Sequence, residues 1–127
     1  MTIQETAALL QTMDRVLLLT HVRPDGDTIG SAAALCRALR DLGKTAYLLP
    51  NPGITETYAC YAAPYWAEEG FEPDFVVSVD IAALGLLPEN AKKYASRIDL
   101  AIDHHPSNEG FAKESCVCLL YTSDAAD

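Results

Sequence analysis

A short stretch near the N-terminus constrains the fold more than any other part of the chain. The apolar run Val16–Leu19 is followed by a polar turn, His21–Asp27, which contains one histidine, two aspartates, Pro24 and Gly26. An uninterrupted apolar run is typical of a parallel strand that is covered on both faces, and proline and glycine make the chain turn. Because an amphipathic segment comes next, the stretch predicts a strand, a polar turn and a helix.

The helix is expected to run from about 28 to 42, where Gly43 is a typical stop signal. We expect Asp27 and Thr28 to cap its first turn. A turn from strand to helix lies at the carboxyl edge of a parallel sheet, where open α/β folds bind ligands. The polar turn is therefore the first candidate for a functional site. The apolar helix face consists of Ile29, Ala32, Ala33, Cys36 and Leu39.

The rest of the chain alternates between strand-like and helix-like segments. A capping box in Thr2–Glu5 predicts a short helix over residues 2 to about 13. This alternation predicts a three-layer α/β/α fold with a mainly parallel, Rossmann-like sheet. Further strands are expected at about 45–49, 74–80 and 97–102, and further short helices at about 55–66 and 88–95.

Two of the later strands also end in side chains that bind metals. One ends in Asp80, and the next is followed by the run Asp103–His105, an aspartate and two histidines. In a parallel sheet these ends share one edge with His21–Asp27. Carboxylates and imidazoles without cysteine favour Mn²⁺, with Mg²⁺ or Zn²⁺ as alternatives. So many ligands suit two ions, with Asp80 bridging them as in two-metal phosphoesterases.

Each of these residues also has a simpler structural interpretation. Asp25 and Asp27 are common turn and cap residues. Asp80 is a suitable residue to cap a helix, and His104 is compatible with a hydrogen-bonded core histidine. None of these interpretations accounts for their joint occurrence at three strand ends.

The composition limits the classes of function. A length of 127 residues suits one domain, and half of the residues are hydrophobic. No apolar run approaches the roughly 20 residues of a membrane helix, and the N-terminus has no signal-peptide pattern. We therefore expect a cytoplasmic protein without membrane contact. A net charge of −9 argues against gripping long nucleic acid through a basic surface.

Cysteines and aromatic residues receive mainly structural interpretations. Cys36 is expected to be a buried small hydrophobe, and Cys116 and Cys118 lack the usual spacing of a zinc site. Helically spaced aromatic residues are more often packing residues than the wall of a substrate pocket, although both interpretations stay open. The aromatic residues in question are Tyr58, Tyr61, Tyr65 and Trp66.

The three strand ends resemble the first three motifs of the DHH phosphoesterase superfamily. The resemblance runs from about residue 13 to 111, and its nearest match is the bacterial nanoRNase group. Members of that group are oligoribonucleases that also dephosphorylate 3′-phosphoadenosine 5′-phosphate. The matching motifs are His21-x-x-Pro24-Asp25-x-Asp27-x-x-Gly30-Ser31, Val79-Asp80 and Asp103-His104-His105. The resemblance implies a metal-dependent phosphoesterase that uses two Mn²⁺ ions to activate a water molecule.

The resemblance also implies a metal-binding role for five residues. His21 and Asp25 would hold the first ion, and Asp27 and His104 would hold the second. Asp80 would bridge the two ions. The expected substrate is a short RNA oligonucleotide or a small nucleotide, and we expect the full-length parent to form a homodimer.

Other motif residues would act on the substrate or on the ligands. Asp103 would orient the neighbouring side chains without binding metal itself. His105 would contact the scissile phosphate or assist the leaving group. Gly30 and Ser31 would let the helix start approach the strand and the phosphate, and close packing alone is an equal interpretation. The expected catalytic residues are Asp80, His104 and His105.

The chain departs from the family pattern at its C-terminal end. Family members carry a further metal-binding aspartate after the third motif and a C-terminal domain with a Gly-rich motif, and neither is recognisable here. Leu119–Asp127 resembles read-through of a sequencing adapter more than family sequence. We therefore expect residues 1–117 to be an incomplete N-terminal DHH domain and residues 118–127 a non-native tail, with the C-terminal substrate-binding domain absent.

Several alternative functions stay open at this point. A cyclic-dinucleotide phosphodiesterase and a single-strand DNA exonuclease of the same superfamily share these motifs. A catalytically incomplete module that only binds nucleotide or metal is a third alternative. A response-regulator receiver domain fits less well, because His104 and His105 occupy the strand end where such a domain requires a lysine.

Overall fold

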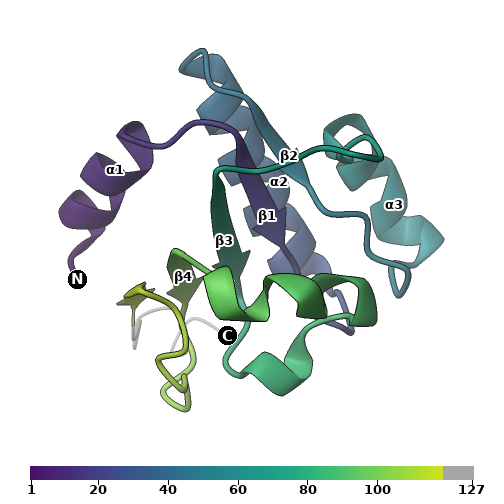
Figure 1. The fold of residues 1–127 in the computed structure, drawn as a ribbon. Coiled ribbons are helices and arrows are strands. Elements are labelled where there is room, and N and C mark those ends of the chain that lie inside the picture. The colour runs from purple at the N-terminus through teal and green to yellow at the C-terminus, as the bar shows by residue number, and fades with distance from the viewer. Residues whose placement is uncertain (119–127) are drawn as a thin grey trace.

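A computed structural model describes residues 1–118, and Figure 1 shows how their elements are arranged. Five parallel strands form one sheet in the order β2-β1-β3-β4-β5. The strands are β1 (Val16–Leu19), β2 (Ala46–Leu48), β3 (Phe75–Val79), β4 (Leu100–Asp103) and β5 (Glu114–Val117). The predicted α/β fold with a parallel sheet is confirmed.

Helical elements cover both faces of this sheet. The α-helices are α1 (Ile3–Gln11), α2 (Gly26–Asp41) and α3 (Glu56–Ala62). The 3-10 helices are η1 (Ala63–Tyr65), η2 (Leu84–Leu86) and η3 (Glu89–Arg97). Helix α2 packs on one face and η3 on the other, which gives the three layers (Figure 1). None of the described helices combines the length and the apolar character needed to cross a membrane.

Strand β1 lies at the centre of both hydrophobic layers. Val16 and Leu18 pack into the layer beneath α2, whereas Leu17 and Leu19 pack into the layer beneath η3. All of them are fully buried, as the unbroken apolar run predicted. The register pairs Leu19 with Ser78 of β3, so the carboxyl ends of these strands lie at one edge of the sheet.

The start of α2 differs from the sequence prediction. The helix begins at Gly26, and its N-cap is Asp25, whose side chain accepts a hydrogen bond of 3.0 Å from the backbone N–H of Thr28. The prediction that Asp27 and Thr28 form the cap was wrong. Thr28 is buried, and its hydroxyl donates to the carbonyl of Val79 at 3.0 Å. Gly43 follows the end of the helix with φ +84°, in agreement with the expected stop.

The other elements follow the predictions with local exceptions. The capping box is present, since the backbone N–H of Glu5 donates to Thr2 Oγ1 and that of Thr2 donates to Glu5 Oε1. Helix α3 ends before Pro64, which lies in η1. Strand β5 was missed, because its short segment has no clear alternation and gains its strand partners only from β4. The tail predicted for residues 118–127 lies outside the described residues except for Cys118.

The cysteines occupy different environments. Cys36 is buried on the inner face of α2, where its thiol donates to the carbonyl of Ala46, and burial raises the pKa of this thiol to about 11. Its predicted role as a small core residue is confirmed. Cys116 is buried, Cys118 is half-buried, and Cys60 is exposed on α3.

The different environments of Cys36 and Cys60 predict selective labelling. At pH 8 a thiol reagent should modify Cys60 quickly and leave Cys36 unmodified, because the reactive species is the thiolate and Cys36 is both buried and protonated. Mass spectrometry of proteolytic fragments measures both sites. Equal labelling rates in the native chain would contradict this placement, and urea-unfolded protein provides the control in which both residues react.

Candidate metal centre

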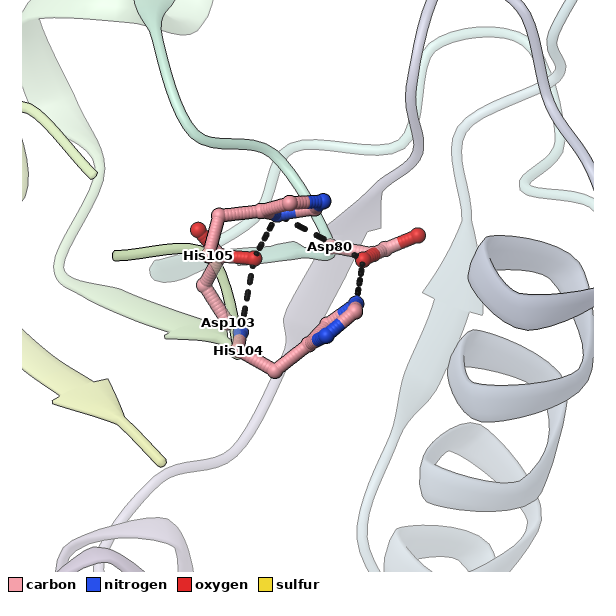
Figure 2. Close-up of side chains that lie close together, drawn as sticks. All are labelled: Asp80, Asp103, His104 and His105. Carbon is pink, nitrogen blue, oxygen red and sulfur yellow. Dashed lines mark hydrogen bonds and ion pairs between the residues drawn. The ribbon is translucent and has the colours of Figure 1, made fainter. Parts of the chain in front are cut away.

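Four side chains that can bind a metal gather where β3 and β4 end. Asp80, Asp103, His104 and His105 each offer one ligand atom, and these atoms all lie within 4.8 Å of one another. Figure 2 shows the rings of His104 and His105 pointing toward Asp80, with Asp103 beside His105. His104 Nε2 lies 2.7 Å from Asp80 Oδ1, and His105 Nδ1 lies 3.8 Å from the same oxygen. The two strand ends predicted to share one site are therefore in direct contact.

The backbone of Asp80 has an unusual conformation. Its φ is +64°, in the left-handed region that side-chain-bearing residues seldom adopt. Its N–H donates to the carbonyl of Ile102 at 2.9 Å, which attaches the turn to β4. Such conformations cost free energy and cluster at functional sites. At this position the conformation accompanies the contact between the carboxylate and the histidines.

Asp103 holds the two histidines in place. Its side chain is fully buried (0% exposed), and its Oδ1 accepts hydrogen bonds from the backbone N–H of His104 at 2.8 Å and from Nδ1 of His105 at 2.5 Å. The bond to Nδ1 leaves the Nε2 of His105 available to a ligand. Both oxygens of Asp103 are in use, since Oδ2 accepts from Asn108 Nδ2 at 2.9 Å. This geometry is compatible with the orienting role expected for Asp103.

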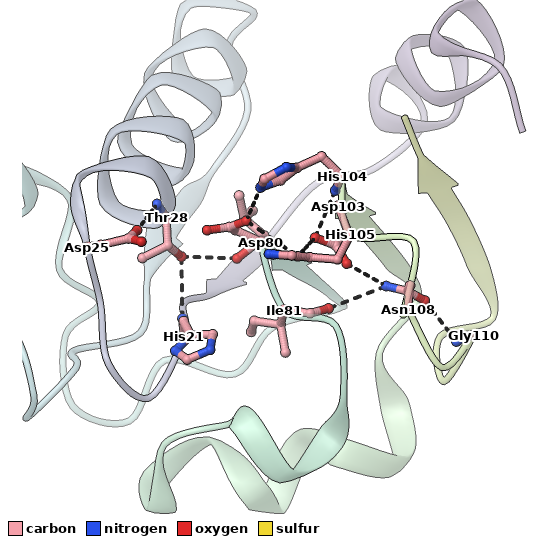
Figure 3. A network of polar contacts seen from close by, with 11 residues as sticks. His21, Asp25, Thr28, Asp80, Ile81, Asp103, His104, His105, Asn108 and Gly110 are labelled. Carbon is pink, nitrogen blue, oxygen red and sulfur yellow. Dashed lines mark hydrogen bonds and ion pairs between the residues drawn. The ribbon is translucent and has the colours of Figure 1, made fainter. Parts of the chain in front are cut away.

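Asn108 is a site residue that the sequence analysis missed. Besides its bond to Asp103, its Nδ2 donates to the carbonyl of Ile81 at 3.4 Å, and its Oδ1 accepts from the N–H of Gly110 at 2.8 Å (Figure 3). It therefore braces the loop after β4 against the loop after β3. The signal available in the sequence was the turn-forming run Ser107–Gly110, in which an asparagine side chain commonly bonds to nearby backbone.

The polar turn after β1 approaches the cluster from the other side of Asp80. In Figure 3, His21 and Asp25 lie on the side of Asp80 opposite His105. The backbone N–H of His21 donates to Thr28 Oγ1 at 3.3 Å, and that hydroxyl donates to the last residue of β3. This chain of bonds ties the turn to the strand end that carries Asp80.

The expected ligands of the turn are not part of the tight cluster. Among the described residues, the group within 4.8 Å contains neither His21 nor Asp25 nor Asp27. His21 Nδ1 accepts from the N–H of Arg23 at 2.9 Å, and Asp25 Oδ1 caps α2. Each therefore retains one further ligand atom, whereas Asp27 is exposed on the first turn of α2. Their assignment as ligands stays a prediction.

A buried asparagine on the next loop supports the polar turn. Asn51 is 4% exposed, and its Nδ2 donates to Thr20 Oγ1 at 2.8 Å and to the carbonyl of His21 at 2.7 Å. Its Oδ1 accepts from the N–H of Gly53 at 2.9 Å. The sequence analysis treated this proline- and glycine-rich stretch only as a chain break. A buried amide with satisfied hydrogen bonds fixes the loop that carries His21.

The predicted role of Gly30 and Ser31 toward the substrate phosphate stays a prediction, but the structure tests the alternative of close packing. Both are exposed on α2, and a Cβ at Gly30 would meet no atom of another element within 4 Å. Close packing therefore does not explain the glycine, and that interpretation was wrong. The aromatic residues take both of the proposed roles. Trp66 and Tyr65 pack against the core beneath α2, and Tyr65 also lines a cavity together with Tyr58 and Tyr61.

The local environment shifts the ionisation of Asp80. Partial burial is the largest cause and raises the pKa of its carboxyl group, and the charge of Asp25 raises it further. The neighbouring imidazoles of His104 and His105 act in the opposite direction. Burial therefore opposes the ionisation of Asp80, and a bound cation would favour the ionised form.

The fold and the cluster define a parallel α/β domain with a carboxylate–imidazole site at its carboxyl edge. The description "DHH family, N-terminal domain" matches residues 15–126, so the chain belongs to the DHH family. This finding confirms the family resemblance of the three motifs and excludes the receiver alternative.

The chain is similar to known proteins both in sequence and in structure. A 37-residue stretch is 54% identical to the bifunctional oligoribonuclease and PAP phosphatase NrnA of Thermus thermophilus, and it covers 29% of this chain and 11% of that protein. The structure is similar to the crystal structure of an exopolyphosphatase-related protein from Bacteroides fragilis, with a TM-score of 0.64 and 25% identity. That match covers 91% of this chain and 38% of the other, so the chain spans only a minor part of both relatives.

The contact between Gly53 and the polar turn predicts a sensitive position. A Cβ on Gly53 would lie 2.7 Å from the backbone oxygen of Val22, so Gly53→Ala must displace the turn. We expect a loss of about 1–3 kcal/mol in the free energy of unfolding, measured by urea denaturation. Gly85→Ala is the matched control, because a Cβ there meets nothing within 4 Å. Equal stability of the two variants would contradict the close approach.

The raised pKa of Asp80 predicts a stabilising substitution. The native chain holds the Asp80 proton more tightly than the unfolded chain does, so this group's stabilising contribution is complete at low pH and is lost as the pH rises through the native pKa. In metal-free buffer at pH 7, Asp80→Asn should raise the urea midpoint, since asparagine tolerates φ +64° and still accepts from His104. Asp74→Asn removes only an exposed ion pair of 3.8 Å with Arg15, and it should change the midpoint little. A lower urea midpoint for Asp80→Asn would refute the raised pKa of Asp80.

Proposed function

We propose that the intact protein is a metal-dependent phosphoesterase that hydrolyses short oligoribonucleotides, 3′-phosphoadenosine 5′-phosphate, or both. The observation that carries the proposal is the 2.7 Å contact between Asp80 and His104, which joins the second and third motifs at one edge of the sheet. Membership in the DHH family and the similarity to an oligoribonuclease and PAP phosphatase support the same conclusion.

The donor set of the site fits divalent cations. Its potential ligands are carboxylates and imidazoles, which suit Mn²⁺, Mg²⁺ or Zn²⁺. His21 and Asp25 would hold one ion, Asp27 and His104 the other, and Asp80 both. When bound, a pair of such ions supplies an activated water molecule and positive charge for the phosphoryl oxygens. We favour two Mn²⁺ ions.

The other residues of the cluster would position the substrate and donate a proton to the departing oxygen. Asp103 holds Nδ1 of His105, so the ring presents its Nε2 to the site in a constant orientation. From there His105 would contact an oxygen of the scissile phosphate or donate a proton to the departing oxygen. Asn108 would keep Asp103 in place through its 2.9 Å bond, and thereby act through another residue rather than on the substrate.

One observation favours a second candidate, a module that binds nucleotide or metal without chemistry. Within residues 1–118, no carboxylate from beyond β4 joins the cluster, although family members are expected to add a metal-binding aspartate after the third motif. Calorimetry with Mn²⁺ separates the two functions. Two binding sites support the enzyme, whereas one weak site or none supports the incomplete module.

Hydrolysis of a labelled RNA dinucleotide by the full-length parent with Mn²⁺ tests the proposed reaction. Asp80→Ala should reduce the release of mononucleotides to background, because the carboxylate that contacts both histidines is lost. Asp103→Asn should reduce it by roughly 10–100-fold, the usual effect of losing a group that orients ligands. The control is Asp74→Asn, at the opposite end of β3. Unchanged activity in Asp80→Ala would refute the proposal.

A further inference from the structure

We propose that a groove between α2 and α3 binds a nucleoside ring and a phosphate of the substrate, on the side away from the scissile bond. This inference rests on the proposed function and assigns a second binding region to its nucleotide substrate. The groove has a volume of about 370 Å³, within the usual range for small-molecule sites. It is open to solvent and is not part of the carboxylate–imidazole cluster.

Small residues on α2 create the floor of the groove. Gly26 and Gly30 lie one helical turn apart on the face that looks toward α3. A Cβ on Gly26 would lie 3.6 Å from the ring of Tyr58, and a Cβ on Gly30 would meet nothing within 4 Å. A larger side chain at either position would fill space that is now empty. The floor is therefore shaped to leave room beside the tyrosine wall.

Three tyrosines form the opposite wall. Tyr58 and Tyr61 come from α3, and Tyr65 comes from η1. Within residues 1–118 their hydroxyl groups make no hydrogen bonds, and Tyr61 is 64% exposed. Aromatic faces stack with nucleobases independently of base identity. Inorganic polyphosphate has no ring to occupy such a wall, so the groove favours a nucleotide over that substrate.

An arginine supplies the charge expected of a phosphate-binding groove. Arg37 lines the groove and is exposed, and it forms no ion pair with any carboxylate in the part of the chain that the structure describes. Other basic residues of the described part also lack an ion pair, so it is the position of Arg37 in the groove that makes it the candidate. A guanidinium group binds phosphate oxygens in a bidentate manner. Its charge is complementary to a nucleotide.

The groove begins beside the metal centre. Gly26 directly follows Asp25, the helix cap that faces Asp80 across the polar turn (Figure 3). Arg37 lies eleven residues further along α2, which corresponds to about 16 Å at the helical rise per residue. A ligand that enters from the strand edge would therefore place its rings against the tyrosines and a second phosphate near Arg37.

Binding of adenosine 5′-monophosphate to the 127-residue chain in EDTA tests the inference. Dissociation constants and binding positions come from NMR chemical-shift titration, with adenosine and inorganic phosphate as separate ligands. Tyr61→Leu should raise the dissociation constants of both adenosine and adenosine 5′-monophosphate by roughly fivefold or more. Arg37→Gln should raise the dissociation constant of the monophosphate by a similar factor and leave that of adenosine unchanged. Both substitutions are at exposed positions, which protects the fold.

Lys92→Gln is the matched control, because it removes an exposed positive charge on η3, across the sheet from α2. Absence of monophosphate binding, binding unaffected by either groove variant, or shifts confined to the metal centre would overturn the inference. A concentration-dependent dimer that Tyr61→Leu dissociates, without any effect on nucleotide binding, would instead assign the groove to a second copy of the chain. Because no metal is present, failure of the proposed hydrolysis would leave these results unchanged.

Discussion

The contact between Asp80 and His104 is the interaction on which the rest of the site depends. It joins residues 24 positions apart in the chain, and it forms because β3 and β4 are adjacent, parallel and in a register that aligns their carboxyl ends. The same register places the buried carboxylate of Asp103 beneath both histidines. Any change in strand order or register would separate these groups, so the hydrophobic layers around the sheet also determine the chemistry at its edge.

Two buried or half-buried asparagines brace the loops in the same way. Asn51 bonds to the loop that carries His21, and Asn108 bonds to Asp103 and to the loop after β3. Each amide donates from Nδ2 to a neighbouring loop, and its Oδ1 accepts from a backbone N–H two residues further on in its own loop. Neutral amides perform this role without adding charge to an edge of the sheet that already contains several carboxylates. A further acidic residue there would disfavour the ionised form of Asp80.

The conformation and environment of Asp80 suit a residue that binds a cation. The residue combines a left-handed backbone, a side chain only 12% exposed and a raised pKa. The backbone conformation costs free energy, and burial disfavours the ionised carboxyl group, so a positive charge beside Asp80 would be favourable. Proteins retain such unfavourable arrangements where function requires them. The fully buried β1 and the layers on both of its faces supply the surrounding stability.

The amino-acid sequence by itself determined the fold class and the two strand ends that meet, because apolar runs and turn residues are local signals that survive without tertiary context. It predicted the capping box at Thr2, the stop at Gly43 and the buried Cys36 for the same reason. Only the tertiary structure decided the bracing by Asn51 and Asn108, the strand β5 and the groove beside α3. These features depend on contacts between segments distant in the chain, which local residue patterns do not specify.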